Sequence, residues 1–475
     1  MIDQGIRYIK LNAVYLLLAA YALAGILTIF FFDGTGDDGD SIAHYFFARY
    51  APVHPVLYLN HWAKPLFVLI SSPFAQFGFI GMKIFNLCVS ILAFYLTFRT
   101  AEQLGIRNPL LVVVFMIFTP LYFVLTFSGL TEPLFALFLI GAVYLTTRKE
   151  LLIAAIVVSF MPFIRSEGLI IMIVFGFYFL VTRQLKYLPW LLAGHLVFSL
   201  AGFVVYHDFL WVFNKIPYAS LETKYGNGPV LHYVFQLNYV IGIPLYFLLV
   251  AGLISYPWQY LKTRTPLLRE EYILVVFGFF AYLIAHSVFW YFGIFNSMGL
   301  KRVLLGVLPL ICLMALRGYN FIIDGISAKI NIAGMVAGSL LILYVLIFPF
   351  THNPAAINWK KDMKLTGAQK MAAAVGIYIK ENPVAPGARL LYFFPYLSET
   401  LKIDHFDSLR RVDLSLKNIS TLHKDDRIIW DNWFAVIEAH VTLETLINTP
   451  GLFHEIDFTS KNEDREVRFV IFRKE

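Results

Sequence analysis

The sequence DGTGDDGDSIAHYFFARYAPVHPVLYLNHWAKP, residues 33–65, follows the first long apolar run and interrupts an otherwise hydrophobic stretch that ends near residue 350. Four carboxylates open it, and three histidines and two cations follow: Asp33, Asp37, Asp38, Asp40, His44, His54, His61, Arg49 and Lys64. A charge inside the hydrocarbon core of a membrane costs about 2.5–3.5 kcal/mol or more. We therefore expect this segment to lie on a membrane surface or in a water-filled cavity, as the first outer loop of a membrane protein.

The composition of the whole chain indicates a polytopic membrane protein. Of its 475 residues, 59% are hydrophobic and only 15% are charged, whereas soluble domains contain about 25% charged residues. The net charge of +7 lies entirely before residue 351, because residues 351–475 contain 17 Lys and Arg and 17 Asp and Glu. Membrane topology accounts for such an excess, so nucleic acid is excluded as a partner. The two cysteines, Cys88 and Cys312, lie in apolar runs and indicate no disulfide framework.

Eleven apolar segments predict membrane helices, although several are shorter than the roughly 20 residues that a span needs. They are residues 11–32, 79–98, 109–125, 132–147, 151–164, 168–182, 188–207, 238–256, 272–292, 303–316 and 330–350. Thirteen cations fall in alternate loops, which the positive-inside rule assigns to the cytoplasm. The short segments then form hairpins with outer tips at 128–132 and 165–168. The first run is too long for a signal peptide, so we expect a cytoplasmic amino terminus and an extracytoplasmic carboxyl terminus.

Residues 351–475 predict a small soluble α/β domain outside the membrane, separate from a transmembrane domain of residues 1–350. The segment 366–382 has helical character and stops at Asn382-Pro383. Short apolar segments at 389–394, 427–430, 453–458 and 467–472 predict strands. The predicted fold is thus an α-helical polytopic membrane protein with an α/β domain at its carboxyl end.

Asp40 is the strongest candidate for a catalytic carboxylate. It precedes the helical stretch SIAHYFFARYA, and His44 lies four residues further on, so the two share a helix face. The alternative is that Asp40 only caps this helix. Asp37 and Asp38 are alternative carboxylates, or a solvated turn with the neighbouring glycines. Asp37, Asp38 and Asp40 together with His44 could also hold a divalent cation, since such cations take oxygen ligands, although the spacing does not establish a metal site.

Other polar residues at the predicted outer face are candidates for binding a substrate or a phosphate. His61 and Lys64 close the first outer loop, where a lysine beside an aromatic residue can also be a membrane anchor. Glu132, Arg165 and Glu167 occupy the two hairpin tips, where they could contact substrate or form a structural ion pair. Lys301 and Arg302 begin the tenth helix, and an arginine can bind a phosphate through two parallel hydrogen bonds. Tyr225 and His232 lie in a glycine-containing outer loop that could cover a site.

Three segments resemble motifs of the GT-C glycosyltransferases: TEPLFALFLIGAVYL from Thr131, RSEGLIIM from Arg165 and GLKRVLLGVLPL from Gly299. This family includes the protein O-mannosyltransferases, the mannosyltransferases of glycosylphosphatidylinositol assembly and bacterial relatives. An acidic first outer loop after one helix is a further likeness, and the resemblance covers about residues 11–350. Two positions depart from the pattern, because Asp40-Ser41 stands where many members have Asp-Glu and Ser166 replaces the usual proline.

The resemblance implies a multi-pass protein of the bacterial inner membrane that uses a polyprenyl-phosphate sugar donor and inverts the anomeric carbon. The sugar expected is mannose or a similar hexose, and the acceptor is a lipid, a glycan or a protein. Asp40 would accept the proton of the acceptor hydroxyl, and Arg302, Lys301 or Lys64 would hold the departing phosphate. Such enzymes are described as metal-independent, so no cofactor is expected and a divalent metal is not favoured.

Two other functions compete with this interpretation. A transporter or flippase of lipid-linked glycans would use the polar loop as a binding mouth, but the charges cluster on one side rather than near the bilayer midplane. A ligase or polymerase of glycans would take a lipid-pyrophosphate donor, and the donor head group would separate it from the first interpretation.

Overall fold

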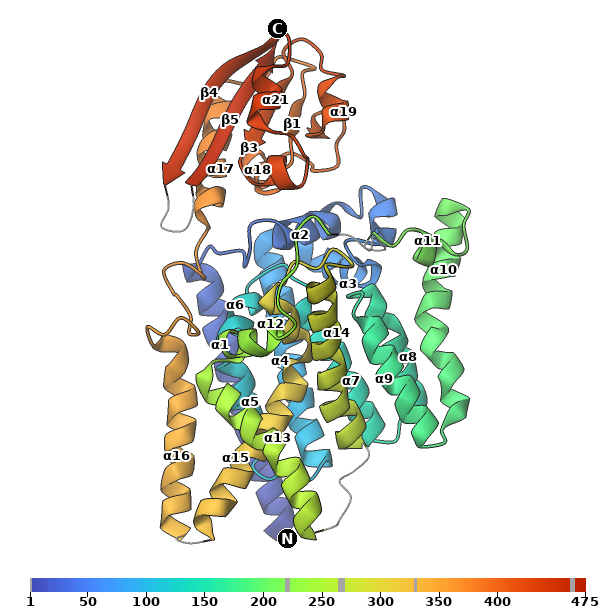
Figure 1. The fold of residues 1–475 in the computed structure, drawn as a ribbon, viewed down its shortest axis with the longest axis vertical. Coiled ribbons are helices and arrows are strands. Elements are labelled where there is room, and N and C mark those ends of the chain that lie inside the picture. The colour runs from blue at the N-terminus through green and yellow to red at the C-terminus, as the bar shows by residue number, and fades with distance from the viewer. Residues whose placement is uncertain (1, 218–222, 264–269, 329–330, 462–465) are drawn as a thin grey trace.

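The computed structural model describes residues 2–217, 223–263, 270–328, 331–461 and 466–475. It shows a bundle of helices with a small sheet domain above one end, which we call the upper end (Figure 1). The N-terminus lies at the lower end of the bundle, and the C-terminus lies at the top of the sheet domain.

Within the described residues, all eleven predicted apolar segments are mainly helical; residue 330, which begins the last segment, lies outside them. Among the described residues, seven helices are long and apolar enough to cross a membrane, and four further apolar helices are shorter. The amino-terminal half contains α1 (Ile2–Phe31), α2 (Asp40–Tyr50), η1 (Pro55–Leu59), α3 (Pro65–Ala75), α4 (Phe79–Gln103), α5 (Leu110–Ile117), α6 (Pro120–Thr126), α7 (Glu132–Thr147), α8 (Leu151–Phe160), η2 (Met161–Phe163), α9 (Gly168–Val181), η3 (Leu185–Leu192), α10 (Ala193–Tyr206) and α11 (Trp211–Asn214).

The rest of the bundle contains α12 (His232–Ile241), α13 (Ile243–Thr263), the π-helix η4 (Glu271–Phe277), α14 (Gly278–Phe292), η5 (Lys301–Val307), α15 (Leu308–Ser327), α16 (Asn331–Ile347) and η6 (Phe348–Phe350). Two expected helices are interrupted. Pro120 forces Thr119 into an extended conformation, which separates α5 from α6. Gly242 has a φ of 79° between α12 and α13, and the ring of Phe348 occupies the space that a Cβ would need.

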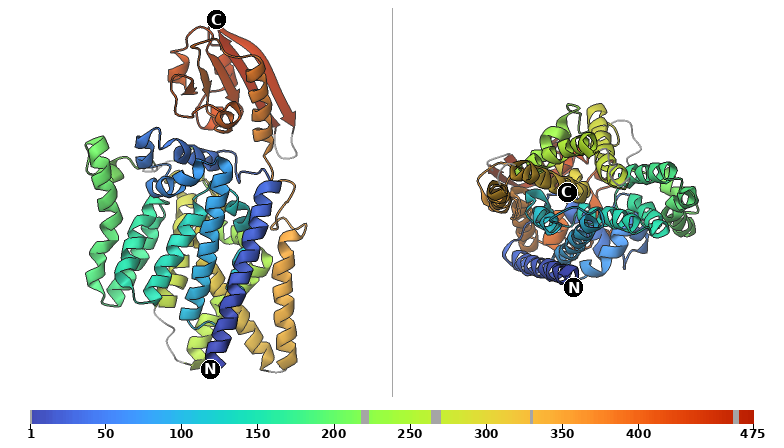
Figure 2. Two further views of the ribbon diagram at one scale, coloured as in Figure 1. Left: turned by 180° about the vertical axis from the view of Figure 1, so that it is seen from behind. Right: turned by 90° about the horizontal axis from the view of Figure 1, so that it is seen from below.

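The helices α7, α8 and α9 are short. The 16 residues of α7 and the 14 residues of α9 extend about 24 and 21 Å at 1.5 Å per residue, less than the ~30 Å hydrocarbon core. Helices α2 and α3 lie over the upper ends of these short helices (Figures 1 and 2). The amino-terminal ends of α7 and α9 therefore meet the first outer loop rather than open solvent.

The carboxyl-terminal domain is an α/β unit, as predicted. Its five-stranded sheet has the order β2-β1-β3-β5-β4, with parallel pairing around β1 and antiparallel pairing around β5. The elements are α17 (Gly367–Glu381), β1 (Leu390–Tyr392), α18 (Tyr396–Leu401), β2 (Arg411–Asp413), α19 (Leu416–Ile419), β3 (Arg427–Asp431), α20 (Phe434–Ile437), α21 (Leu443–Ile447), β4 (Leu452–Lys461) and β5 (Glu466–Lys474). Ile357 and Met363 pack into the bundle core, so the sheet domain itself begins after them.

Candidate active site

The first outer loop brings its carboxylates to the start of α2. The carboxylate Oδ1 of Asp37 accepts the backbone amides of Gly39 (3.1 Å) and Ser41 (2.9 Å). Gly39 is the N-cap residue of α2 and Ser41 lies in its first turn. Asp37 therefore caps α2 from two residues before the N-cap position, by accepting an amide that has no partner within the helix. Capping was the alternative role for Asp40 in the sequence. The structure gives that role to Asp37 and leaves Asp40 on the first turn of the helix.

Arg302, from the start of η5, joins Asp37 and Asp40. Its Nη1 lies 2.7 Å from Oδ2 of Asp37, its Nη2 contacts the carboxylate of Asp40, and its Nε lies 3.7 Å from Oε1 of Glu132. The guanidinium side chain is only 14% exposed, whereas that of Asp40 is 43% exposed. The guanidinium of an arginine presents its donors in a fixed planar fork, and here it engages two carboxylates at once.

The two hairpin tips meet through Arg165. Its Nη1 lies 2.8 Å from Glu132 and its Nη2 lies 2.8 Å from Glu167. Glu132 is 1% exposed, and a buried charge of this kind is tolerated only when it is paired. The structural ion pair that the sequence left open is therefore present, and it connects the tips to Arg302 through Glu132.

His44 and Lys64 complete the cluster. The ring of His44 stacks on Trp62 with centroids 4.9 Å apart, and Nζ of Lys64 donates to Oγ of Ser166 (2.8 Å). Burial lowers the pKa of His44 to about 3, and the charges that act on it are Asp40, Arg302, Arg165 and Lys64. His44 thus lies among these four groups and is uncharged at neutral pH.

Burial and the neighbouring charges set the protonation of the carboxylates. Burial raises the pKa of Asp37 to about 6 despite the nearby Arg302. Burial acts in the same direction on Asp40, but the guanidinium of Arg302 outweighs it and lowers the pKa of Asp40. Burial also opposes ionisation of Glu167, and Arg165 overcomes it and lowers the pKa of Glu167 to about 2. Asp40 is therefore ionised at neutral pH, partly exposed and able to accept a proton.

Five other predicted residues make contacts outside this cluster. Nε2 of His61 lies 2.9 Å from the carbonyl of Val212, and Nε2 of His232 lies 2.8 Å from that of Gly299. Lys301 lies over the ring of Tyr239. Asp38 accepts a hydrogen bond from Thr366, and Tyr225 donates to Glu438 of the carboxyl-terminal domain (2.7 Å).

Two residues that the sequence analysis did not select lie beside the cluster. Nε2 of His286 is 3.7 Å from Oε1 of Glu167, and Gln369 contacts the first outer loop. A lone histidine inside an apolar segment is a signal that could have identified His286. Among the described residues, no group of three or more His, Cys, Asp or Glu side chains is arranged to hold a metal ion.

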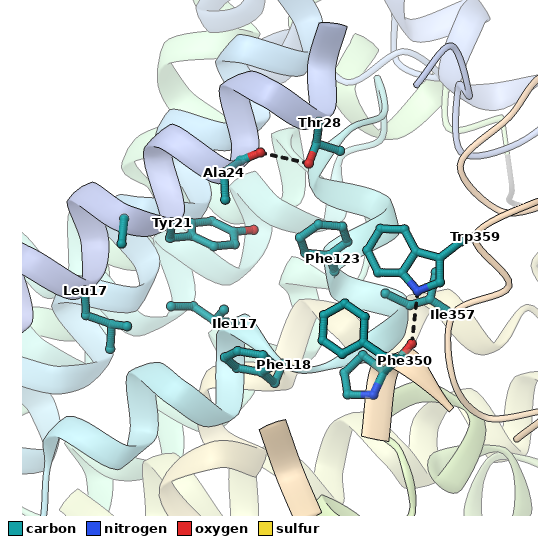
Figure 3. Close-up of a pocket in the computed structure, with 12 residues that line it drawn as sticks. Leu17, Tyr21, Ala24, Thr28, Ile117, Phe118, Phe123, Phe350, Ile357 and Trp359 are labelled. Atoms are coloured by element: carbon teal, nitrogen blue, oxygen red, sulfur yellow. Dashed lines mark hydrogen bonds between the residues drawn. The ribbon is translucent and has the colours of Figure 1, made fainter. Parts of the chain in front are cut away.

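A separate apolar cavity of about 380 Å³ lies between α1, the junction of α5 and α6, and the segment that follows α16 (Figure 3). Tyr21, Phe123, Phe350 and Trp359 line it, with Thr28 at one edge. None of the charged residues of the cluster lines this cavity.

The chain was compared with known proteins. No family model matches it, and no curated protein matches its sequence. Two solved structures of ArnT from Cupriavidus metallidurans share its fold over nearly the full length. The structure with undecaprenyl phosphate bound has a TM-score of 0.59 at 12% identity and covers 96% of this chain and 97% of its own. The apo structure has a TM-score of 0.64 at 11% identity and covers 98% of both chains. The chain described here therefore has the fold of ArnT.

Proposed function

We propose that this chain is a membrane glycosyltransferase that moves a sugar from a polyprenyl-phosphate donor to the hydroxyl of a lipid, glycan or protein acceptor. The observation that carries the proposal is the grouping of one partly exposed carboxylate, Asp40, with Arg302, Arg165 and Lys64 at one end of a GT-C fold. The similar ArnT structure has undecaprenyl phosphate bound, which supports a lipid-phosphate donor. Mannose or a similar hexose is the proposed sugar.

The reaction needs one base and a stabilised leaving group. The acceptor oxygen attacks C1 of the sugar from the face opposite the phosphate, its proton passes to Asp40, and the bond from C1 to the phosphate oxygen breaks. The products are an inverted glycoside and the polyprenyl phosphate. Negative charge grows on the departing phosphate, where Lys64 and Arg302 would stabilise it. A phosphate held in this way leaves without a protonating acid, unlike the alcohol that departs in glycoside hydrolysis.

The proposed orientation places the cluster outside the cytoplasm of a bacterial inner membrane. Among the described loops that carry these cations, those between α4 and α5, between α7 and α8, and between α9 and η3 lie at the same end of the bundle as the amino terminus (Figure 1). The positive-inside rule assigns that end to the cytoplasm. The carboxyl-terminal domain then faces the extracytoplasmic space, as does the first outer loop. Labelling of a cysteine introduced at Gly39 only from the cytosolic side would contradict this orientation.

The test uses the purified full chain in lipid nanodiscs with a panel of radiolabelled polyprenyl-phosphate sugars and candidate acceptors. We expect one donor to be consumed with release of polyprenyl phosphate, and the variant Asp40→Asn to lose this activity while it inserts and folds normally. Asp324→Asn is the matched control, because Asp324 is an exposed carboxylate paired with Arg107 outside the cluster. Turnover by Asp40→Asn near that of the wild type would remove Asp40 as the base. Movement of lipid-linked sugar without its consumption would favour a flippase.

A further inference from the structure

The carboxyl-terminal domain contacts the loop that carries Asp37 and Asp40. Five hydrogen bonds connect residues 33–38 to residues 363–369. The amide of Gly34 donates to the carbonyl of Met363 (3.0 Å), the amide of Leu365 donates to Asp33 (3.2 Å), the hydroxyl of Thr366 donates to Asp38, and Gln369 contacts both Thr35 and Asp37. The loop is thus held by a segment more than 300 residues away in the sequence.

Gln369 is the most deeply placed residue of this contact. It is completely buried in the first turn of α17, where it forms a capping box with Thr366. Its Oε1 accepts the amide of Thr366 (3.2 Å), while its Nε2 donates to Oγ1 of Thr35 (2.7 Å) and to the carbonyl of Asp37 (3.0 Å). One side chain therefore anchors α17 and the first outer loop together.

The contact continues from Gln369 to the cluster. Thr35 donates its hydroxyl to the same carbonyl of Asp37 (2.7 Å), and its own carbonyl accepts the hydroxyl of Ser41 (2.5 Å). Ser41 in turn accepts the amide of Gly129 at the first hairpin tip (2.7 Å). The backbone of Asp37 is fixed on one side, and its carboxylate caps α2 and pairs with Arg302 on the other.

We propose that Gln369 of the carboxyl-terminal domain is a positioning residue of the active site, which sets the placement of Asp40 through the backbone of Asp37. The inference rests on the proposed function and gives the carboxyl-terminal domain a part in catalysis. Gln369 touches neither substrate nor the reacting atoms in this role. It fixes the loop from which α2, Asp40 and His44 take their positions.

A second contact between the domain and the bundle supplies the matched control. His54 lies 2.9 Å from Asp404, and the hydroxyl of Tyr50 donates to the carbonyl of Ile403. Tyr50 is the last residue of α2 and His54 follows the helix, and neither contact involves Thr35, Asp37 or Arg302. A residue that only docks the domain should resemble Asp404, whereas a positioning residue should affect the chemistry at the other end of α2.

The experiment compares Gln369→Glu with Asp404→Asn in the full chain in nanodiscs. Glutamate retains the acceptor for the amide of Thr366 and removes both donors to the loop. With the donor sugar that the wild type consumes, we expect kcat to fall roughly 10- to 100-fold, the range that a small misplacement of a catalytic group can cause, with the donor KM unchanged. Thr35→Val removes the hydrogen bond from Gln369 to Thr35 and the one from Thr35 to the carbonyl of Asp37. It leaves the hydrogen bond from Gln369 to Asp37, so kcat should fall in the same direction but by less, without any change in α17.

Hydrogen exchange of the peptide covering residues 33–41 gives a readout independent of activity. We expect faster exchange in Gln369→Glu and Thr35→Val, and wild-type exchange in Asp404→Asn. Unchanged exchange, or an equal fall of kcat in Asp404→Asn, would overturn the positioning role. Faster exchange in a protein whose wild type transfers no sugar would overturn the proposed function instead, and the link from Gln369 to the loop would stand.

Discussion

Removal of Arg302 tests the cluster most directly. The variant Arg302→Met deletes the only group that joins Asp37 to Asp40 among the described contacts, and it takes away one of the two cations beside the buried Glu132. Breaking a buried ion pair costs about 3–5 kcal/mol, because the remaining charge is left without a partner. Since Asp40 is partly exposed and Glu132 keeps Arg165, we expect the lower end, a loss of about 3 kcal/mol in the free energy of unfolding.

The assay is denaturation of the purified protein in detergent at about pH 7.5 and about pH 5, with Lys301→Met as the control. Lys301 is adjacent in sequence but lies over the ring of Tyr239, so its removal should change the free energy of unfolding by less than about 1 kcal/mol. In Arg302→Met the loss should shrink at the lower pH, because protonation of Asp37 removes an unpaired buried charge. Equal stability of the two variants at both pH values would refute the reasoning.

Three further predictions concern the reaction. Because the pKa of Asp37 is about 6, activity should fall as the pH drops below about 6. A neutral Asp37 no longer competes for Arg302, which then pairs with Asp40 alone and makes Asp40 a weaker base. Asp37→Asn should have lower activity and no such fall at acid pH; a pH–rate profile that still shows the fall would assign it to another group. Burial lowers the pKa of Lys64 to about 8, so the donor KM should rise above that pH as Lys64 loses its charge. Lys64→Arg should keep the donor KM constant over the same range, and an unchanged rise in its donor titrations would exclude Lys64 as the cause. Treatment with a chelator should leave transfer intact because arginine and lysine supply the positive charge; a loss that magnesium or manganese restores would contradict this.

Much of the fold could be predicted from the sequence, because a span in lipid must be apolar and the cations between spans report the loops. The breaks within the spans were harder to predict. Pro120 gave a local signal for one of them, but the close approach of Phe348 to Gly242 depends on a helix about a hundred residues away. In the carboxyl-terminal domain, helix α17 and four of the strands were predicted. Strand β2 was missed because its three residues, Arg411–Asp413, contain a single apolar side chain.

The sequence indicated which residues belong to the candidate site but not which of them contact one another. Because charge is costly in lipid, the charged residues of the outer loops and hairpin tips could be identified as candidates. Their catalytic roles stay predictions. No local pattern distinguishes Asp37 from Asp40, since only the three-dimensional position of the Ser41 amide and of Arg302 shows which carboxylate caps the helix. Gln369 could not be found at all, because a capping box is a sufficient local explanation for its presence.

The capping of α2 by Asp37 has a consequence for turnover. In the proposed reaction Asp40 gains a proton in every cycle and must lose it before the next. A helix that relied on Asp40 for its first amides would loosen each time that charge vanished, and His44 would shift with it. Because the carboxylate of Asp37 holds the start of the helix, Asp40 can gain and lose a proton without moving the helix that positions it.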